Sequence, residues 1–307
     1  MLVTFPRDFP VMETALVEIG PRDHGLHDSY VAFITQVSGE QQFRPWADRG
    51  GWGDDYTAFA LMENDEIIAT VGRMSMRFVV DGAISAGYQL GAIATRPDRR
   101  NQGHMRRLME HILALPPLDN RTTLIFAVSD TAAIYPRFGF ERITEWQFQL
   151  PVSAFPSLVS AVDLDIGSAD DRALLRSACR EAIELSEDFS AVDYYPILLW
   201  HLSHRALTAK RLIDAEAIVI VQQTGANLHI CDIVTPRKIT IMDHIPMLAS
   251  GPIKTVSFGF NPQGWLTIED SEKLERSETD EAAGILFSLG RPSPKGRIGR
   301  LPELARI

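Results

Sequence analysis

The hydrophobic positions of the first 150 or so residues change period repeatedly, which predicts an alternation of strands and helices. Alternating or continuous apolar runs predict strands, and spacings of three and four residues predict helices. Turn signals at 64–65 (Asn-Asp) and 81–82 (Asp-Gly) join three of the strands in antiparallel order. The expected strands are Thr14–Ile19, Tyr56–Met62, Glu66–Val80, Ile84–Thr95, Thr122–Val128 and Ile143–Leu150, and the expected helices are His27–Val37, a short one within Glu40–Asp55, His104–Leu115 and Ala132–Phe138.

This order of elements indicates the α/β class, with a mixed, mainly antiparallel central sheet. Pro151 and Pro156 then mark a boundary. We expect a first domain over residues 1–152, a second α/β domain over 153–290, and an extended tail over 291–307, which is rich in Gly, Pro and Arg. In the second half the pattern predicts helices at Ala169–Ser186, Tyr195–Arg211 and Ile241–Leu248 and strands at Ala217–Gln222, Asn227–Val234 and Thr255–Phe260.

One segment of the second half resembles one of the first. His229–Leu248 repeats the order strand, Pro, basic loop and helix found in Ala92–Leu115, but it has no glycine at the position of Gly103. The second domain is therefore either a degenerate copy of the first or a separate accessory domain.

Composition narrows the class of protein. The chain has 307 residues, of which 45% are hydrophobic and 23% charged, as in ordinary globular domains. A formal net charge of −10 argues against nucleic-acid binding. Cys179 and Cys231 are far apart with no CxxC spacing, so we expect neither a disulfide nor a metal site. No signal peptide and no apolar run of membrane-spanning length is present, so we expect a cytoplasmic protein with no membrane partner. The sequence leaves open whether the chain forms a homo-oligomer.

The segment Ala92–Met105, AIATRPDRRNQGHM, carries the clearest chemical signal. It reads as an apolar strand that turns through Pro97 into an arginine-rich loop, which opens a helix after Gly103. Backbone N–H groups at a helix N-terminus bind anions, and the missing side chain of a glycine lets a phosphate approach. The segment therefore predicts a site for a pyrophosphate-bearing cofactor.

A second segment strengthens this interpretation. Thr122–Val128 is followed by SDTAAIYPRFGF, residues 129–140, in which Tyr135 stands four residues before Gly139-Phe140. Together with the order Arg100, two residues, Gly103, one residue and Met105, this pattern resembles the GNAT superfamily of acetyl-coenzyme A-dependent N-acetyltransferases. The family has a small residue where this chain has Met105. The resemblance implies a sheet with splayed strands, acetyl-CoA as co-substrate, no metal, and cofactor contacts from Ile93, Ala94, Thr95, Arg99, Arg100, Asn101, Gln102, Gly103, His104, Met105 and Arg106.

The resemblance also implies roles in catalysis. It assigns Tyr135 as the general acid that protonates the leaving thiolate of coenzyme A, with direct attack by the amine. No cysteine lies near these motifs to form an acyl-enzyme. Aromatic and acidic residues between 40 and 56 suit a cationic small-molecule or peptide amine, or they cover a sheet edge. The candidates for acceptor contacts are Trp46, Trp52, Asp54 and Asp55, and the general base is left open among Glu40, Asp54, Asp55 and Glu63.

Residues 99–108 and 129–140 are similar, in particular, to the enhanced-intracellular-survival branch of bacterial acetyltransferases. That branch has a second GNAT-like domain and a third, sterol-carrier-like domain, for which this sequence is too short. The terminal carboxylate serves as the base there, a role that would fall on Ile307 here. Two alternatives use the phosphate-binding loop at Gly103 without acetyl transfer. One is an acyl-CoA-binding regulatory protein that has lost catalysis, and the other is a nucleotide-binding protein with a different phosphate ligand.

Overall fold

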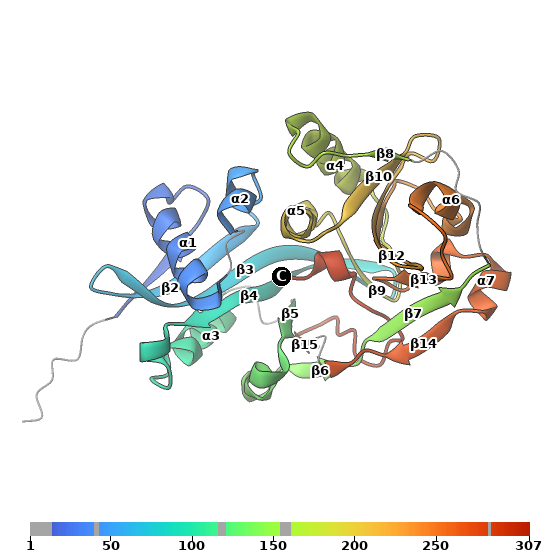
Figure 1. Ribbon diagram of the computed structural model, residues 1–307. Coiled ribbons are helices and arrows are strands. Elements are labelled where there is room, and N and C mark those ends of the chain that lie inside the picture. The colour runs from blue at the N-terminus through green and yellow to red at the C-terminus, as the bar shows by residue number, and fades with distance from the viewer. Residues whose placement is uncertain (1–13, 40–42, 116–120, 154–160, 282–283) are drawn as a thin grey trace, which may run out of the picture.

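The protein is built on two mixed β-sheets that lie side by side, as the computed structural model in Figure 1 shows. The structure describes residues 14–39, 43–115, 121–153, 161–281 and 284–307. Within them, the first sheet has eight strands and the second has seven. Both sheets are mainly antiparallel, so the predicted fold class is confirmed.

The first sheet follows the sequence order closely. Its strands run β1 (Ala15–Ile19), β2 (Tyr56–Glu63), β3 (Glu66–Val80), β4 (Ala83–Thr95), β5 (Thr122–Ala127), β15 (Ile285–Leu289) and β6 (Glu141–Ile143), and β9 (Phe189–Val192) pairs with the far end of β3. Helices α1 (His24–Ser38) and α2 (Phe43–Asp48) cover one face, and α3 (His104–Ala114) covers the other (Figure 1). The predicted strands before residue 128 and the helix at 104 are confirmed.

Helix α3 shows why its sequence docks on the sheet. Leu108, Met109 and Ile112 recur at steps of one, three and four residues, so they share one face of the helix. All three are fully buried against β2, β3 and β5. Burial of each such side chain contributes roughly 1.5–3 kcal/mol, which fixes the helix N-terminus relative to the sheet.

The second sheet repeats the plan of the first. Strands β10 (Thr208–Leu212), β11 (Ala217–Thr224) and β12 (Asn227–Val234) are antiparallel, and helix α6 (Ile245–Leu248) then leads to β13 (Thr255–Phe258), which is parallel to β12. In the first sheet β4 leads through α3 to β5 in the same way. The second half thus repeats the plan of the first without the glycine loop, as one of the two interpretations of the sequence predicts.

The two sheets exchange a strand. β7 (Trp146–Pro151) follows β6 in sequence but pairs with β13 and with β14 (Glu275–Glu278) in the second sheet. β15, from the second half, fills the corresponding place between β5 and β6 in the first sheet. The chain therefore crosses between the sheets on both sides of residue 152. As a division into units that fold alone, the expected boundaries at 152 and 290 stay a prediction.

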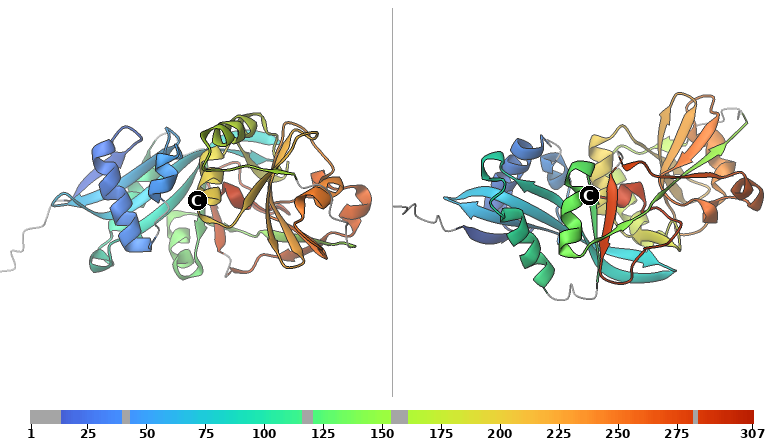
Figure 2. Two further views of the ribbon diagram at one scale, coloured as in Figure 1. Left: turned by 45° about the horizontal axis from the view of Figure 1, so that its top comes forward. Right: turned by 90° about the horizontal axis from the view of Figure 1, so that it is seen from below.

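Several predicted elements of the later part of the chain are wrong in part. The expected helix Ala169–Ser186 ends at Glu181. The expected strand Ile143–Leu150 is two strands in different sheets, broken at 144–145. The expected helix Tyr195–Arg211 ends at His204 as α5 (Tyr195–His204), and the following residues form strand β10 because their alternating pattern pairs with β11. The tail expected to be extended includes a short 3-10 helix, η7 (Glu303–Ala305), and Leu301 and Leu304 are fully buried. Views from two more directions show this terminal stretch between the halves (Figure 2).

Candidate active site

The candidate site begins where strands β4 and β5 separate. Their parallel pairing covers only Gly87–Leu90 against Thr122–Ile125. Beyond this point β4 stays paired with β3, whereas β5 stays paired with β15. Residues 91–95 of β4 therefore present main-chain N–H and C=O groups to a gap between two strands, as the predicted splay requires.

An irregularity in β4 shapes this edge. Two residues, Ala92 and Ile93, lie opposite the single residue Val71 of β3, which makes a β-bulge. Ala92 has a φ of +47°, a left-handed value that is strained for an alanine. The hydroxyl of Thr70 donates to the carbonyl of Ala92 at 2.9 Å and holds the bulge in place. A bulge at this position changes the direction of the strand at the edge of the gap.

The loop after β4 delivers a helix N-terminus to the same gap. A short 3-10 turn, η1 (Pro97–Arg99), leads into the loop, and Gly103 is the N-cap of α3 with a φ of +84°. A Cβ added at Gly103 would meet no atom within 4 Å, so the space in front of the helix end is open. These are the features that a phosphate needs: free amides, the positive helix end and no side chain in the way.

The arginines of the loop divide into two groups. The guanidinium of Arg99 forms an ion pair with Glu63, so its charge is largely engaged by the protein. Arg100 donates only a long hydrogen bond of 3.3 Å, to the carbonyl of Thr95. Arg106 faces the groove, and so does Arg137, which the sequence interpretation did not include. Arg100, Arg106 and Arg137 are therefore the charges that could neutralise a pyrophosphate and the neighbouring phosphate groups.

Tyr135 lies on the opposite wall. It belongs to the 3-10 helix η3 (Ser129–Phe138), where Gly139 provides the left-handed cap at φ +84°. The side chain is 5% exposed and packs against Phe140 and Phe287. Burial raises the pKa of Tyr135 above its ordinary value, and a hydrogen bond with Thr131 opposes this shift only in part. The phenol therefore carries its proton at neutral pH.

These parts form one groove of about 1040 Å³. Of the eleven residues predicted to contact the cofactor, ten line it; the exception is Gln102, whose side chain bonds the carbonyl of Asp98 and the ring of His104. The last residue of the sequence, Ile307, also lines the groove, 216 positions from its neighbour Gly91. No local motif marks this contact. The groove-lining residues outside the predicted set are Val37, Ser38, Leu90, Gly91, Ala92, Glu110, Ile125, Phe126, Ala127, Val128, Thr131, Ile134, Arg137, Phe138 and Ile307.

The residues expected to contact the acceptor lie elsewhere. Trp46 and Trp52 are 3% and 7% exposed and pack in an aromatic cluster with Phe43 and Tyr56. This burial favours the alternative interpretation, that the aromatic residues cover the sheet. Asp54 is exposed and does not line the groove, and Asp55 lines a separate cavity of about 280 Å³ between β3 and helices α4 (Ala169–Glu181) and α5. Of the remaining candidate bases, Glu63 is paired with Arg99, and Glu40 lies outside the described residues.

Fold and groove together define the class. A sheet that opens between two parallel strands, with a glycine-capped helix N-terminus at the opening, is the arrangement expected of GNAT acetyltransferases. Residues 30–143 match the family model described as "Acetyltransferase (GNAT) domain". Residues 30–143 thus match a GNAT acetyltransferase domain, which confirms the resemblance to the GNAT superfamily.

Several solved structures resemble the fold of this chain at low sequence identity. A conserved protein of unknown function from Enterococcus faecalis V583 has a TM-score of 0.60 at 10% identity, over 90% of this chain and 72% of that one. Eis1 from Mycobacterium abscessus has a TM-score of 0.57 at 14% identity, over 89% and 73%. A GCN5-related N-acetyltransferase from Kribbella flavida has a TM-score of 0.50 at 13% identity, over 89% and 70%. No curated protein sequence matches the chain. At these identities the likeness concerns the fold alone.

Among the described residues, no helix combines the length and the apolar character that crossing a bilayer requires.

Proposed function

We propose that the protein transfers the acetyl group of acetyl-CoA to a primary amine by direct attack, with Tyr135 as general acid. The observation that carries the proposal is the single groove that joins the helix N-terminus at Gly103, the free edge of β4 and the phenol of Tyr135. The acceptor is a small-molecule or peptide amine.

The groove offers a place for each part of acetyl-CoA. The amides near Gly103 and the charges of Arg100, Arg106 and Arg137 suit the phosphates. The unpaired edge of β4 suits the amide groups of the pantetheine arm, which can pair with it as an added strand does. The cofactor supplies an activated acetyl thioester, and the chain's own groups orient it.

The chemistry then needs two proton transfers. The amine nitrogen forms a bond to the acetyl carbon, the carbon–sulfur bond breaks, and the sulfur needs a proton. Tyr135 holds that proton because burial raises the pKa of its phenol. The attacking nitrogen gives up a proton to a base or to water.

The proposed base comes from a residue that is far in sequence from the rest of the groove. In the branch that the sequence resembles, the terminal carboxylate has this role. Carried over, it falls on the main-chain carboxyl of Ile307, and it requires this residue to be the free end of the protein. The position of Ile307 in the groove supports the carry-over. Asp54, Asp55 and Glu63 lie outside the groove lining.

A thiol-release assay tests the proposal. Wild-type protein is incubated with acetyl-CoA and, in turn, aminoglycosides, polyamines, amino acids and peptides. We expect amine-dependent release of free coenzyme A with at least one acceptor, and a product heavier by one acetyl group in mass spectrometry. Binding of CoA without turnover on any amine would instead favour the regulatory protein. Stabilisation by nucleotides but not by CoA would favour the nucleotide-binding protein.

A further inference from the structure

The last residues of the chain connect the two sheets. We call residues 300–307 the terminal segment. Its Glu303 N–H donates to the carbonyl of Gly259, just after β13 of the second sheet, at 2.9 Å. Its Ile307 N–H donates to the side-chain oxygen of Gln89 on β4 of the first sheet. The C mark in Figure 1 shows this end at the centre of the molecule, between the halves. The segment is therefore hydrogen-bonded to both sheets.

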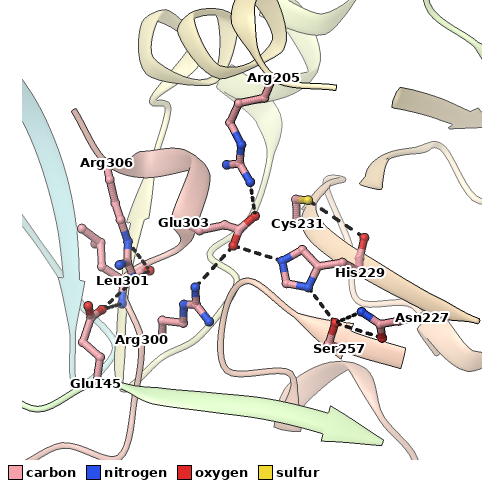
Figure 3. A network of polar contacts seen from close by, with 10 residues as sticks. All are labelled: Glu145, Arg205, Asn227, His229, Cys231, Ser257, Arg300, Leu301, Glu303 and Arg306. Atoms are coloured by element: carbon pink, nitrogen blue, oxygen red, sulfur yellow. Dashed lines mark hydrogen bonds and ion pairs between the residues drawn. The ribbon is translucent and has the colours of Figure 1, made fainter. Parts of the chain in front are cut away.

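The first anchor of the segment is the carboxylate of Glu303. Arg205 and Arg300 each donate to it at 3.3 Å, and His229 Nε2 lies 3.0 Å from it. Figure 3 shows the three donors converging on the carboxylate from different elements. Burial alone would raise the pKa of Glu303, but the hydrogen bond from His229 and the nearby positive charges outweigh it and hold the pKa well below its usual range. Glu303 is therefore a fixed negative charge.

The second anchor is the buried ion pair between Arg306 and Glu145. The two groups are 2.7 Å apart, with 7% and 3% of their side chains exposed. Glu145 lies where the chain passes from β6 to β7, and it also accepts from the N–H of Leu301 at 2.9 Å. The guanidinium in turn donates to the carbonyl of Leu301. A buried pair of this kind contributes little net stability but is costly to break, which makes it a good device for fixing one conformation.

The third anchor sets the place of Ile307 itself. Gln89, which is fully buried, donates to the carbonyl of Ala305 at 3.0 Å and accepts from the N–H of Ile307. Gly91, two residues further along β4, has no side chain, and a Cβ there would lie 2.9 Å from the side chain of Ile307. The close approach of Ile307 to the splayed edge of β4 thus depends on Gly91.

The Glu303 network could also be considered as a metal site or a catalytic triad. His229, Cys231 and Glu303 place possible ligand atoms within 4.8 Å of one another, and His229 Nδ1 lies 2.8 Å from the hydroxyl of Ser257. However, both nitrogens of His229 and both oxygens of Glu303 already have protein partners. Two guanidinium groups beside the carboxylate also repel a cation. Holding the terminal segment is therefore the role that the contacts support best.

We propose that Glu303 and Glu145 are positioning residues for acetyl transfer: they fix the terminal segment so that Ile307 closes the groove beside the splayed strands. This inference rests on the proposed function. Misplacement of a groove wall by about 1 Å can lower a catalytic rate by 10²-fold without touching the cofactor site. The second domain, which lacks the glycine loop, would then contribute to the reaction through geometry.

The test compares Glu303→Gln with Glu216→Gln. Glu216 forms an exposed ion pair with Arg237 in the second half, and among the described residues no hydrogen bond or ion pair joins it to the terminal segment. In Glu303→Gln we expect kcat to fall 10- to 100-fold, with the KM for acetyl-CoA within twofold because the loop at Gly103 is untouched. Hydrogen–deuterium exchange of residues 300–307 should quicken. Glu216→Gln should match the wild type in kcat, in the KM for acetyl-CoA and in exchange of residues 300–307. Unchanged kcat, or loss of cofactor affinity in step with kcat, would overturn the assignment.

A milder variant covers the case in which Glu303→Gln does not fold. Arg205→Met removes one partly exposed donor to Glu303 and leaves Arg300 and His229 in place. Arg205→Met should lower kcat by less than Glu303→Gln does and should also quicken exchange at 300–307. An unchanged kcat or unchanged exchange in this variant would count against the inference. Should the wild type acetylate no amine, the proposed function falls. Exchange at 300–307 in the variants then decides on its own whether Glu303 holds the segment.

Discussion

The N–H of Ile307 donates a hydrogen bond to the side-chain oxygen of Gln89, although the two residues are 218 positions apart. This contact places the end of the sequence in the groove that the first 140 residues build. It also shows how the two halves depend on each other: the first half supplies the loop at Gly103 and Tyr135, and the second half supplies a strand of the first sheet and the terminal segment.

The general-acid assignment predicts the behaviour of Tyr135→Phe. Loss of the phenolic proton should lower kcat about 100-fold, since general acids typically contribute 10²–10⁴-fold. The KM for acetyl-CoA should stay within twofold because the ring still packs against Phe140 and Phe287. Steady-state kinetics by thiol release measure both values. Tyr88→Phe is the matched control: its hydroxyl bonds Arg121 outside the groove lining. Equal kcat in Tyr135→Phe and wild type would remove the assignment.

The exchange of strands predicts that the first half does not fold alone. A fragment of residues 1–152 lacks β15, which pairs with β5 along Thr123–Ala127. The edge of β5 is then left unpaired, and such edges aggregate. We expect the fragment to be insoluble or to unfold without cooperativity in circular dichroism. Co-expression with residues 153–307 should restore a soluble complex. A monomeric fragment with a sharp thermal transition would show that the boundary at 152 separates independent domains.

The buried carboxyl of Asp232 predicts how stability depends on pH. Burial raises the pKa of Asp232 to about 7, although Tyr194 donates to it at 2.7 Å. The folded state therefore holds a proton that the unfolded chain releases near pH 4. The free energy of unfolding should fall as pH rises from about 4 to 7, by at most about 4 kcal/mol, and level off above.

Asp232→Asn should abolish this part of the pH dependence and raise the Tm at pH 8, because a neutral side chain has no charge to bury. The exposed Asp214→Asn is the control and should follow the wild type. Thermal melts between pH 5 and 8 measure the difference. In this range the low pKa of Glu303 contributes no slope, because its carboxylate is ionised in both states. Parallel curves for the wild type and Asp232→Asn would contradict the prediction.

The parts of the site that the sequence predicted are local in the chain. The strand–loop–helix around Gly103 was predictable because strand, Pro97, arginines and Gly103 follow one another within a dozen residues, and the turn that carries Tyr135 was predictable because Gly139 ends it. The roles of both segments in binding and catalysis stay predictions. Contacts between distant residues were not predictable in this way. For example, only the fold brings Glu63 to the guanidinium of Arg99. Likewise, nothing near Trp46 shows that its indole N–H will bond the carbonyl of Pro196, 150 positions away.

The remaining errors concern pairings between distant segments. The residues of β10 contain apolar positions compatible with a helix, and their pairing with β11 decides for a strand. The tail after residue 290 looked extended because Gly and Pro are frequent in it. Its ordered structure depends on residues that are far away in sequence. Glu145 binds Arg306, Gln89 binds Ile307, and His229 binds Glu303.

The central claim is that main-chain amides at Gly103 hold the phosphates of coenzyme A, and titration calorimetry tests it most directly. Wild type should release or absorb heat with CoA. Gly103→Asp should lose at least about 100-fold in affinity, because a carboxylate then stands where the pyrophosphate would lie. Gly82→Asp is the matched control, because Gly82 has a φ of +72° against +84° at Gly103 and a Cβ at either position meets no atom within 4 Å. This control variant should bind CoA with the affinity of the wild type. No heat with folded wild type, or equal binding by Gly103→Asp, would contradict the account.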